Sequence, residues 1–326
     1  MKTLGKIHTL FLSLALFSGC AKGKVNTLPA TSPSDSAKAD SIVTSSPSSA
    51  DQSVSLRNRN LLADARYTRA DSVRIDQLLT AARTQPDSTN WMLYFGRQFI
   101  GIPYVGKTLD REMEEHLVVN TRELDCTTFV ETVLALDQCM RHRAYTFTDF
   151  LYELRRIRYL DGEMAYTNRQ HYFTVWMDNN QKMDIVEDIQ GPNPPFTAVQ
   201  HLQVNWMTTH TKDYPQLMAH PEWVGGIRKM EKSITGGKRR YIPKGQIANN
   251  RLFRQTIHDG DILVILTSKQ GLDTSHIGIA AWHKDGLHLL NASYLRHKVV
   301  EEPKTLYQYM QGQRSQTGIR VCRARK

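Results

Sequence analysis

The sequence predicts an α+β domain in which helices precede an antiparallel β-sheet. Apolar side chains recur at helical spacing in several segments before residue 160, and they alternate as in β-strands in several segments after residue 260. Between residues 56 and 326 there is no second linker and no internal repeat. Helices first and strands later are typical of α+β proteins, so we expect one large α+β domain.

Residues 1–19 are predicted to be an export signal. Lys2 and Lys6 precede a short apolar run over residues 10–17, which is too short to span a bilayer. Small residues directly before Cys20 resemble the lipobox of bacterial lipoproteins, although Phe17 stands where leucine is usual. We therefore expect lipidation at Cys20 and a periplasmic lipoprotein held in the outer membrane. An ordinary secretory signal followed by a chance cysteine is the alternative.

Residues 20–55 are predicted to be a flexible linker behind the lipidated cysteine. Ser, Thr, Pro, Ala and Asp dominate this segment, and no aromatic residue occurs between Phe17 and Tyr67. Such a composition buries too little apolar surface to offset the entropy of ordering the chain. Residues 56–326 remain for the domain, with a helical N-terminal part.

The elements of this domain are expected in the following order. Helices are predicted over residues 61–83, 90–100, 125–140 and 148–160, with a break at 87–90. Strands are predicted over 171–177, 183–189, 261–267, 275–282, 287–293 and 318–322, with a turn at 178–180. Residues 190–258 are rich in Pro, Gly, His and basic residues and are predicted to form long irregular excursions, with a helix near 199–209.

The formal net charge is +10, which is compatible with binding to nucleic acid, to an anionic membrane or to an acidic substrate. An exported protein meets little nucleic acid, and basic residues are scattered apart from those at 238–240. We expect no nucleic-acid partner. A generic solvated surface and a preference for acidic cell-wall peptides are the two remaining interpretations.

The helix predicted from Asp125 begins with a cysteine. Asp125 is a good N-cap residue, and Phe129, Val133 and Leu136 form an apolar stripe. Cys126 therefore lies in the first helical turn, where unpaired backbone N–H groups favour the thiolate. A nucleophilic thiol and a small buried hydrophobic residue are both compatible with this position.

Cysteine number and spacing favour a free thiol. If Cys20 is lipidated, Cys126, Cys139 and Cys322 remain, which is an odd number. Cys126 and Cys139 lie on one predicted helix, roughly 20 Å apart at helical rise, too far for a disulfide. No Cys-x-x-Cys or His-Cys cluster suggests a zinc site.

A candidate base lies on a predicted hairpin. Residues 275–282 and 287–293 are joined by a four-residue turn, which pairs Trp282 with Leu287 and Gly278 with Asn291. Asn291 then lies on the face of His276 as a diagonal neighbour, and Ser293 lies directly opposite His276. Either could hold the imidazole in the tautomer that a base needs, and a structural histidine is equally compatible.

These segments together resemble the NlpC-type, papain-like cell-wall cysteine hydrolases. The chain looks most like their N-acetylmuramoyl-L-alanine amidase-like branch. The motifs that carry the resemblance lie at residues 101–109, 124–131, 171–173, 260–262, 275–279 and 291–293. It covers roughly residue 91 to the C-terminus and implies a papain-like fold with the catalytic helix packed on an antiparallel sheet.

The resemblance also implies a role for each motif residue. Cys126 would be the nucleophile and His276 the base. Asn291 would orient the histidine, although many relatives carry histidine there. Tyr104, His171 and Ser275 would contribute to the oxyanion site or to substrate binding.

The implied reaction is hydrolysis of the amide between N-acetylmuramic acid and the L-alanine of the stem peptide. No metal or cofactor is required. We expect a monomer that acts on released muropeptides rather than on intact wall. The alternatives are an endopeptidase cleaving after D-glutamate, a non-catalytic peptidoglycan-binding lipoprotein, and an acyltransferase using the same thioester.

Overall fold

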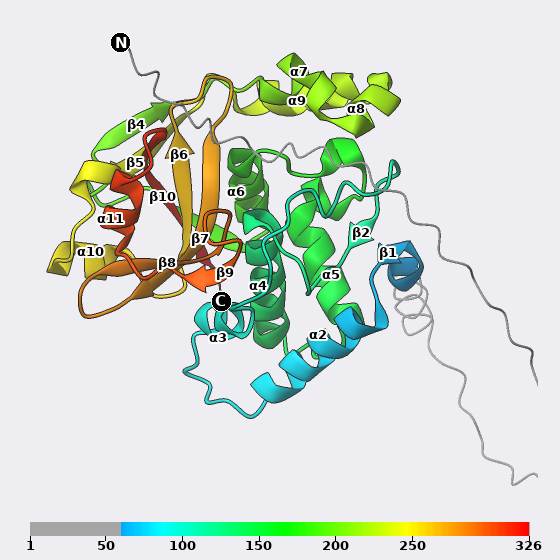
Figure 1. Ribbon diagram of the computed structural model, residues 1–326, viewed down its shortest axis with the longest axis horizontal. Coiled ribbons are helices and arrows are strands. Elements are labelled where there is room, and N and C mark those ends of the chain that lie inside the picture. Colours follow the sequence, from blue (N-terminus) through cyan, green and yellow to red (C-terminus); the bar gives the residue numbers. More distant parts are fainter. Residues whose placement is uncertain (1–59, 326) are drawn as a thin grey trace, which may run out of the picture. The chain divides into compact units, whose positions relative to one another are not determined.

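The computed structural model describes residues 60–325. The predicted signal peptide, Cys20 and all of the predicted linker lie outside the described residues. Residues from Leu61 onward form one compact unit. It combines a layer of helices with an antiparallel sheet, so the predicted α+β class is confirmed (Figure 1).

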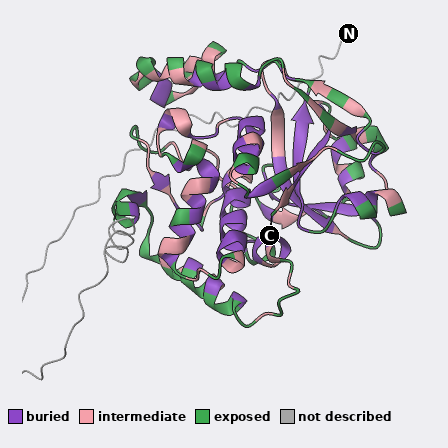
Figure 2. Ribbon diagram, turned by 180° about the vertical axis from the view of Figure 1, so that it is seen from behind, coloured by how far each residue is buried: buried purple, intermediate pink, exposed green. Residues whose placement is uncertain are grey.

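The helical layer surrounds one buried helix, α4. It contains α2 (Arg69–Ala82), α3 (Trp91–Gln98), α4 (Cys126–Arg141), α5 (Phe147–Arg158) and α6 (Phe173–Lys182). Residues 128–139 of α4 are all buried, and Figure 2 shows α4 buried along most of its length. The apolar stripe predicted for this helix therefore packs against neighbours on several sides, in one core with the sheet.

The main sheet has eight strands in the described part of the chain. They are β3 (Val186–Ile189), β4 (Ala198–His201), β5 (Lys238–Pro243), β6 (Ile262–Thr267), β7 (Thr274–Trp282), β8 (Leu287–Ser293), β9 (Lys298–Glu301) and β10 (Gln316–Ala324). Their order is β4-β5-β10-β6-β7-β8-β9, with β3 also paired to β10, and every pair is antiparallel. Two very short strands, β1 (Ala65–Arg66) and β2 (Leu117–Val118), form a separate parallel pair.

A second apolar core forms with the short helices α10 (Arg251–Thr256) and α11 (Leu306–Gln311). The strands alternate between the two cores. Ile277 and Ile279 of β7 belong to the core with α4, whereas Ala280 belongs to the second core. The sheet is thus buried on both faces.

Residues 190–258 are more regular than predicted. They contain β4, β5, α10 and a helical group of α7 (Trp206–Thr209), α8 (Pro215–Ala219) and α9 (Val224–Ile234). The helix expected near 199–209 is a strand followed by one helical turn, because Val199 to His201 pair with β5. A third apolar core lies beneath the helical group and includes Leu202, Met207 and Ile227.

The strand predicted at 171–177 is wrong, because most of this segment belongs to helix α6. Phe173, Trp176 and Met177 are buried, and a short run that is apolar throughout does not distinguish a strand from a buried helix. The turn predicted at 178–180 is wrong for a related reason. Asn180 remains helical because its side-chain amide donates to the carbonyls of Trp176 (2.9 Å) and Ile157 (3.0 Å).

Candidate functional site

Cys126 is the first residue of α4. The Asp125 side chain accepts from the Thr128 backbone N–H (2.8 Å), and the Thr128 hydroxyl accepts from the Asp125 N–H (2.9 Å). This reciprocal capping box fixes where the helix begins. The half-buried Cys126 sulfur accepts a hydrogen bond from the backbone N–H of Ile277 in β7. The thiol therefore lies against the residue that follows His276.

The thiol is not acidic at rest. Burial, together with the neighbouring Asp125 carboxylate, raises the pKa of Cys126 to about 12. The lowering that we expected from the helix N-terminus is outweighed, because a thiolate loses solvation at this depth and lies beside a carboxylate. Forming a thiolate at this position would therefore require a base.

His276 and Asn291 meet as the hairpin register predicts. Trp282 pairs with Leu287 and Ile279 with Leu290. The His276 Nε2 atom lies 2.8 Å from the Asn291 side-chain oxygen. A Cβ at position 278 would lie 2.9 Å from the Asn291 Cβ, so a glycine at this position leaves room for that side chain. With Nε2 donating to Asn291, Nδ1 is the ring nitrogen that can accept a proton.

Ser293, the alternative partner, bonds elsewhere. Its hydroxyl donates to the buried Glu302 carboxylate at 2.8 Å. Glu302 follows β9 and is also paired with the Arg296 guanidinium at 3.4 Å. Burial lowers the pKa of His276, whereas the Asn291 hydrogen bond and the Glu302 charge raise it. No sequence pattern predicted a role for Glu302, because the sequence alone does not distinguish it from the neighbouring Glu301.

Glu302→Gln is expected to move the acid limb of the pH–activity profile to lower pH. The substitution removes a negative charge that favours imidazolium, so the His276 pKa falls and the neutral base persists at lower pH. The His276 titration, followed by NMR, should move the same way. Glu301→Gln is the control, because Glu301 pairs with Arg97 and His283 instead. An unchanged or raised His276 pKa in Glu302→Gln would contradict the assignment.

Tyr104 lies in a segment that runs beside the start of α4. Val105 donates to the Leu124 carbonyl at 3.1 Å, and Tyr104 donates to the His297 carbonyl at 3.0 Å. The Tyr104 ring packs edge-on against Tyr294 with ring centroids 5.6 Å apart. The tyrosine is thus held beside Leu124, which is two residues before Cys126, and beside the β8–β9 turn.

The two other predicted binding residues differ in their surroundings. Ser275 precedes His276 in β7, and its hydroxyl lies 3.4 Å from the Ile265 carbonyl. His171 was predicted to lie on a strand, but it lies just before α6. Its Nε2 atom lies 2.8 Å from the Tyr166 carbonyl, and burial, with the nearby Arg169, lowers its pKa to about 3. These contacts favour a structural role for His171.

A buried ion-pair network lies behind the start of α4. Arg158 donates to Glu131 of α4 at 2.7 Å, and both side chains are almost fully buried. Arg169 pairs with Asp110 and, at 3.5 Å, with Glu115. These pairs join α4, α5 and the loop after Tyr104. The sequence signal for this network was Glu131, a glutamate on the mainly apolar stretch of α4 between Phe129 and Leu136, which was not predicted to be a buried ion-pair partner.

Side chains that could hold a metal do not gather anywhere in residues 60–325 in a group of three or more His, Cys, Asp or Glu. The three cysteines in this range are all free thiols. No helix in this part of the chain is both long and apolar enough to cross a membrane.

This α+β arrangement is similar to that of several solved bacterial structures. A Bacteroides uniformis N-acetylmuramoyl-L-alanine amidase is 35% identical, with a TM-score of 0.67 over 72% of this chain and 98% of that one. A Bacteroides fragilis structure named as a candidate xylanase is 38% identical, with a TM-score of 0.65 over 70% and 98%. A Legionella pneumophila protein at 21% identity shares the fold, with a TM-score of 0.61 over 78% and 94%.

The family model described as N-acetylmuramoyl-L-alanine amidase-like (AmiA-like) matches residues 94–319. The chain belongs to this family. No curated protein matches it.

Proposed function

We propose that this protein is a cysteine-dependent peptidoglycan amidase with an NlpC-type, papain-like active site. It would cleave the amide between N-acetylmuramic acid and L-alanine. The observation that carries the proposal is that Cys126 contacts the backbone of Ile277 in β7, directly after His276, and that His276 is hydrogen-bonded to Asn291. Family membership and the amidase named among the similar structures support the substrate class.

In the proposed mechanism, Nδ1 of His276 takes the Cys126 proton as the sulfur attacks the lactyl carbonyl carbon. A C–S bond forms, and the carbonyl electrons move to the oxygen. When this intermediate collapses, the C–N bond breaks and His276 protonates the departing alanine amine. Water then attacks the thioester with His276 as base, which breaks the C–S bond and restores the thiol.

The first turn of α4 supplies a donor for the oxyanion. An N–H at this position of a helix has no partner inside the helix, and the Cys126 N–H makes no other backbone hydrogen bond in the described chain. We assign it to the developing oxyanion, with the Tyr104 hydroxyl as the second donor. Ser275 would contact substrate beside His276.

The substrate is proposed to be a released, soluble muropeptide. The segment with α7, α8 and α9 contacts the loop that follows Tyr104 and the hairpin loop that precedes β7. The Lys107 side chain donates to the Asp213 carbonyl (3.4 Å), and the Gln216 side chain donates to the Asp110 carbonyl (3.0 Å). The backbone N–H of Asn205 donates to the Gly271 carbonyl (3.1 Å). Such a wall suits a small fragment better than a cross-linked polymer.

Incubation with defined muropeptides, followed by mass spectrometry, tests the bond and the acceptor together. We expect free stem peptide and free sugar, with faster cleavage of fragments than of intact sacculi at equal amounts of cleavable bond. Products cut after D-glutamate would identify an endopeptidase, and sugar joined to an added amine would identify an acyltransferase. Binding without cleavage would identify a wall-binding protein. Any of these results would refute the proposal.

We further propose that the protein is a monomeric periplasmic lipoprotein, anchored in the outer membrane through Cys20. The sequence of residues 17–20 is the basis of this placement. Cys20→Ala should move the protein from the membrane fraction to the soluble periplasmic fraction. Equal membrane association of the two proteins would refute the anchor.

A further inference from the structure

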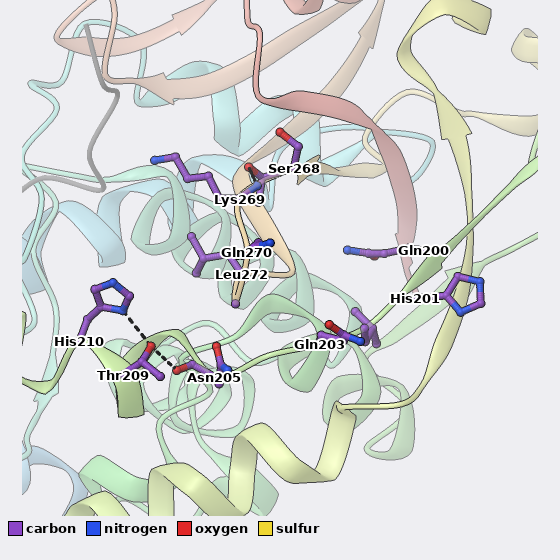
Figure 3. A pocket seen from close by; sticks show the side chains of 13 residues that line it. Gln200, His201, Gln203, Asn205, Thr209, His210, Ser268, Lys269, Gln270 and Leu272 are labelled. Atoms are coloured by element: carbon purple, nitrogen blue, oxygen red, sulfur yellow. Dashed lines mark hydrogen bonds between the residues drawn. The ribbon is translucent and has the colours of Figure 1, made fainter. Parts of the chain in front are cut away.

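A cavity of about 530 Å³ lies beside the loop that joins β6 to β7. It is lined by the end of β4, by residues just before α7 and at its C-terminal end, and by the loop of the β6–β7 hairpin, and its volume is in the range of small-molecule sites. Figure 3 shows side chains from these three segments around one space. The hairpin continues directly into β7, where His276 lies three residues after Asp273, or roughly 10 Å at strand rise.

The cavity is lined mainly by neutral hydrogen-bonding groups. None of its lining residues is acidic, and Lys269 is the one with a charged side chain. Gln203, Asn205 and Gln270 make no side-chain hydrogen bond within residues 60–325, so each can offer a donor and an acceptor to a ligand. The buried Gln200 side-chain oxygen also lacks a partner among the described residues.

The Gln200 amide is held in place. Its nitrogen donates to the Asp273 carbonyl at 2.7 Å. Asp273 is itself buried and accepts from the Thr174 backbone N–H at 2.7 Å. An oxygen that is fixed in position and lacks a partner favours a ligand that donates a hydrogen bond.

Two leucines add a small apolar patch to this polar lining. Leu202 is buried and Leu272 is partly buried, and both join the third apolar core. Amides with both donors and acceptors match sugar hydroxyls, and an apolar patch beside them matches an acetyl methyl group. The neighbouring hollow contains Arg228, Lys232 and Glu231, so its charged lining suits a neutral sugar less well.

We propose that this cavity binds the N-acetylated sugar part of the substrate. The proposal rests on the proposed amidase function. A sugar seated beside the β6–β7 hairpin would have its attached lactyl carbonyl directed along β7 toward His276 and Cys126. Gln203 and Gln270 would be specificity-determining residues, with no part in the chemical step.

The test uses the peptide-free disaccharide of N-acetylglucosamine and N-acetylmuramic acid, titrated by calorimetry against the whole protein. Cys126→Ala should bind it as the unmodified protein does. The double variant Gln203→Ala/Gln270→Ala should bind it about tenfold more weakly, because two hydrogen bonds are lost. Both glutamines are exposed, so the fold should tolerate the change. Gln255→Ala, at an exposed glutamine of α10, is the matched control.

The binding and cleavage assays can fail separately. Disaccharide binding that depends on Gln203 and Gln270 supports the cavity even if the amide is not cleaved. No disaccharide binding, or equal binding by the double variant, overturns the cavity proposal even if cleavage is intact. Displacement of the disaccharide by the stem peptide alone would also overturn it, because the peptide would then occupy the cavity.

Discussion

Cys126→Ala is expected to abolish amide cleavage, with a loss of kcat of about 10³-fold or more. The sulfur is the only group in the proposed mechanism that forms a bond to the substrate. It lies at the first residue of α4, against the N–H of Ile277. Removing it leaves His276 without a nucleophile to activate. The measurement is the rate of stem-peptide release from a purified muropeptide.

Cys139→Ala and Cys322→Ala are the matched controls for this experiment. Both thiols are fully buried in apolar surroundings, Cys139 within α4 and Cys322 in β10. Burial raises the pKa of each thiol well above its usual range, so neither is suited to attack a carbonyl. Their loss should lower stability slightly and leave kcat within a few-fold. Full activity in Cys126→Ala would refute the mechanism.

Asn291→Ala is expected to reduce kcat by roughly 10- to 100-fold with a small change in KM. Its side-chain oxygen is the acceptor that holds the His276 Nε2–H, so the ring loses its tautomer and orientation when the oxygen is removed. Asn291→Asp keeps an acceptor at this position and should recover part of the rate. Steady-state kinetics on one defined muropeptide separates kcat from KM.

Ser293→Ala is the control for the orienting role of Asn291. Ser293 also lies on the His276 side of β8, but its hydroxyl is bonded to Glu302 and not to the imidazole. Its loss should have a smaller effect than the loss of Asn291. If Ser293→Ala collapses kcat while Asn291→Ala stays within a few-fold, Ser293 is the partner of the histidine.

The proposed mechanism requires a coupled proton transfer between the thiol and the imidazole. Burial holds the Cys126 pKa near 12 and lowers that of His276, so the resting pair is neutral. In that mechanism the proton would move as the sulfur attacks, because the Asn291 hydrogen bond and the Glu302 charge favour the imidazolium that forms. Burial that disfavours the thiolate should also slow oxidation of Cys126 in the absence of substrate, because oxidants react with the thiolate.

The sequence by itself determined the features of this protein that depend on local spacing. A capping residue followed by an apolar stripe placed Cys126 at the first turn of α4, because caps and helical periodicity act within a few residues. The even length of the 283–286 turn set the hairpin register, which brings Asn291 to His276. Both results follow from near neighbours along the chain.

Only the tertiary structure decided the features that depend on burial and on distant segments. The apolar run before residue 178 became helix α6 because packing surrounds it, and Glu302 reaches the His276 face from beyond β9. The thiol pKa rose because folding removes water from the sulfur, which outweighs the helix terminus. Desolvation and long-range electrostatics arise from all segments that meet at a point, so no local pattern in the chain contains them.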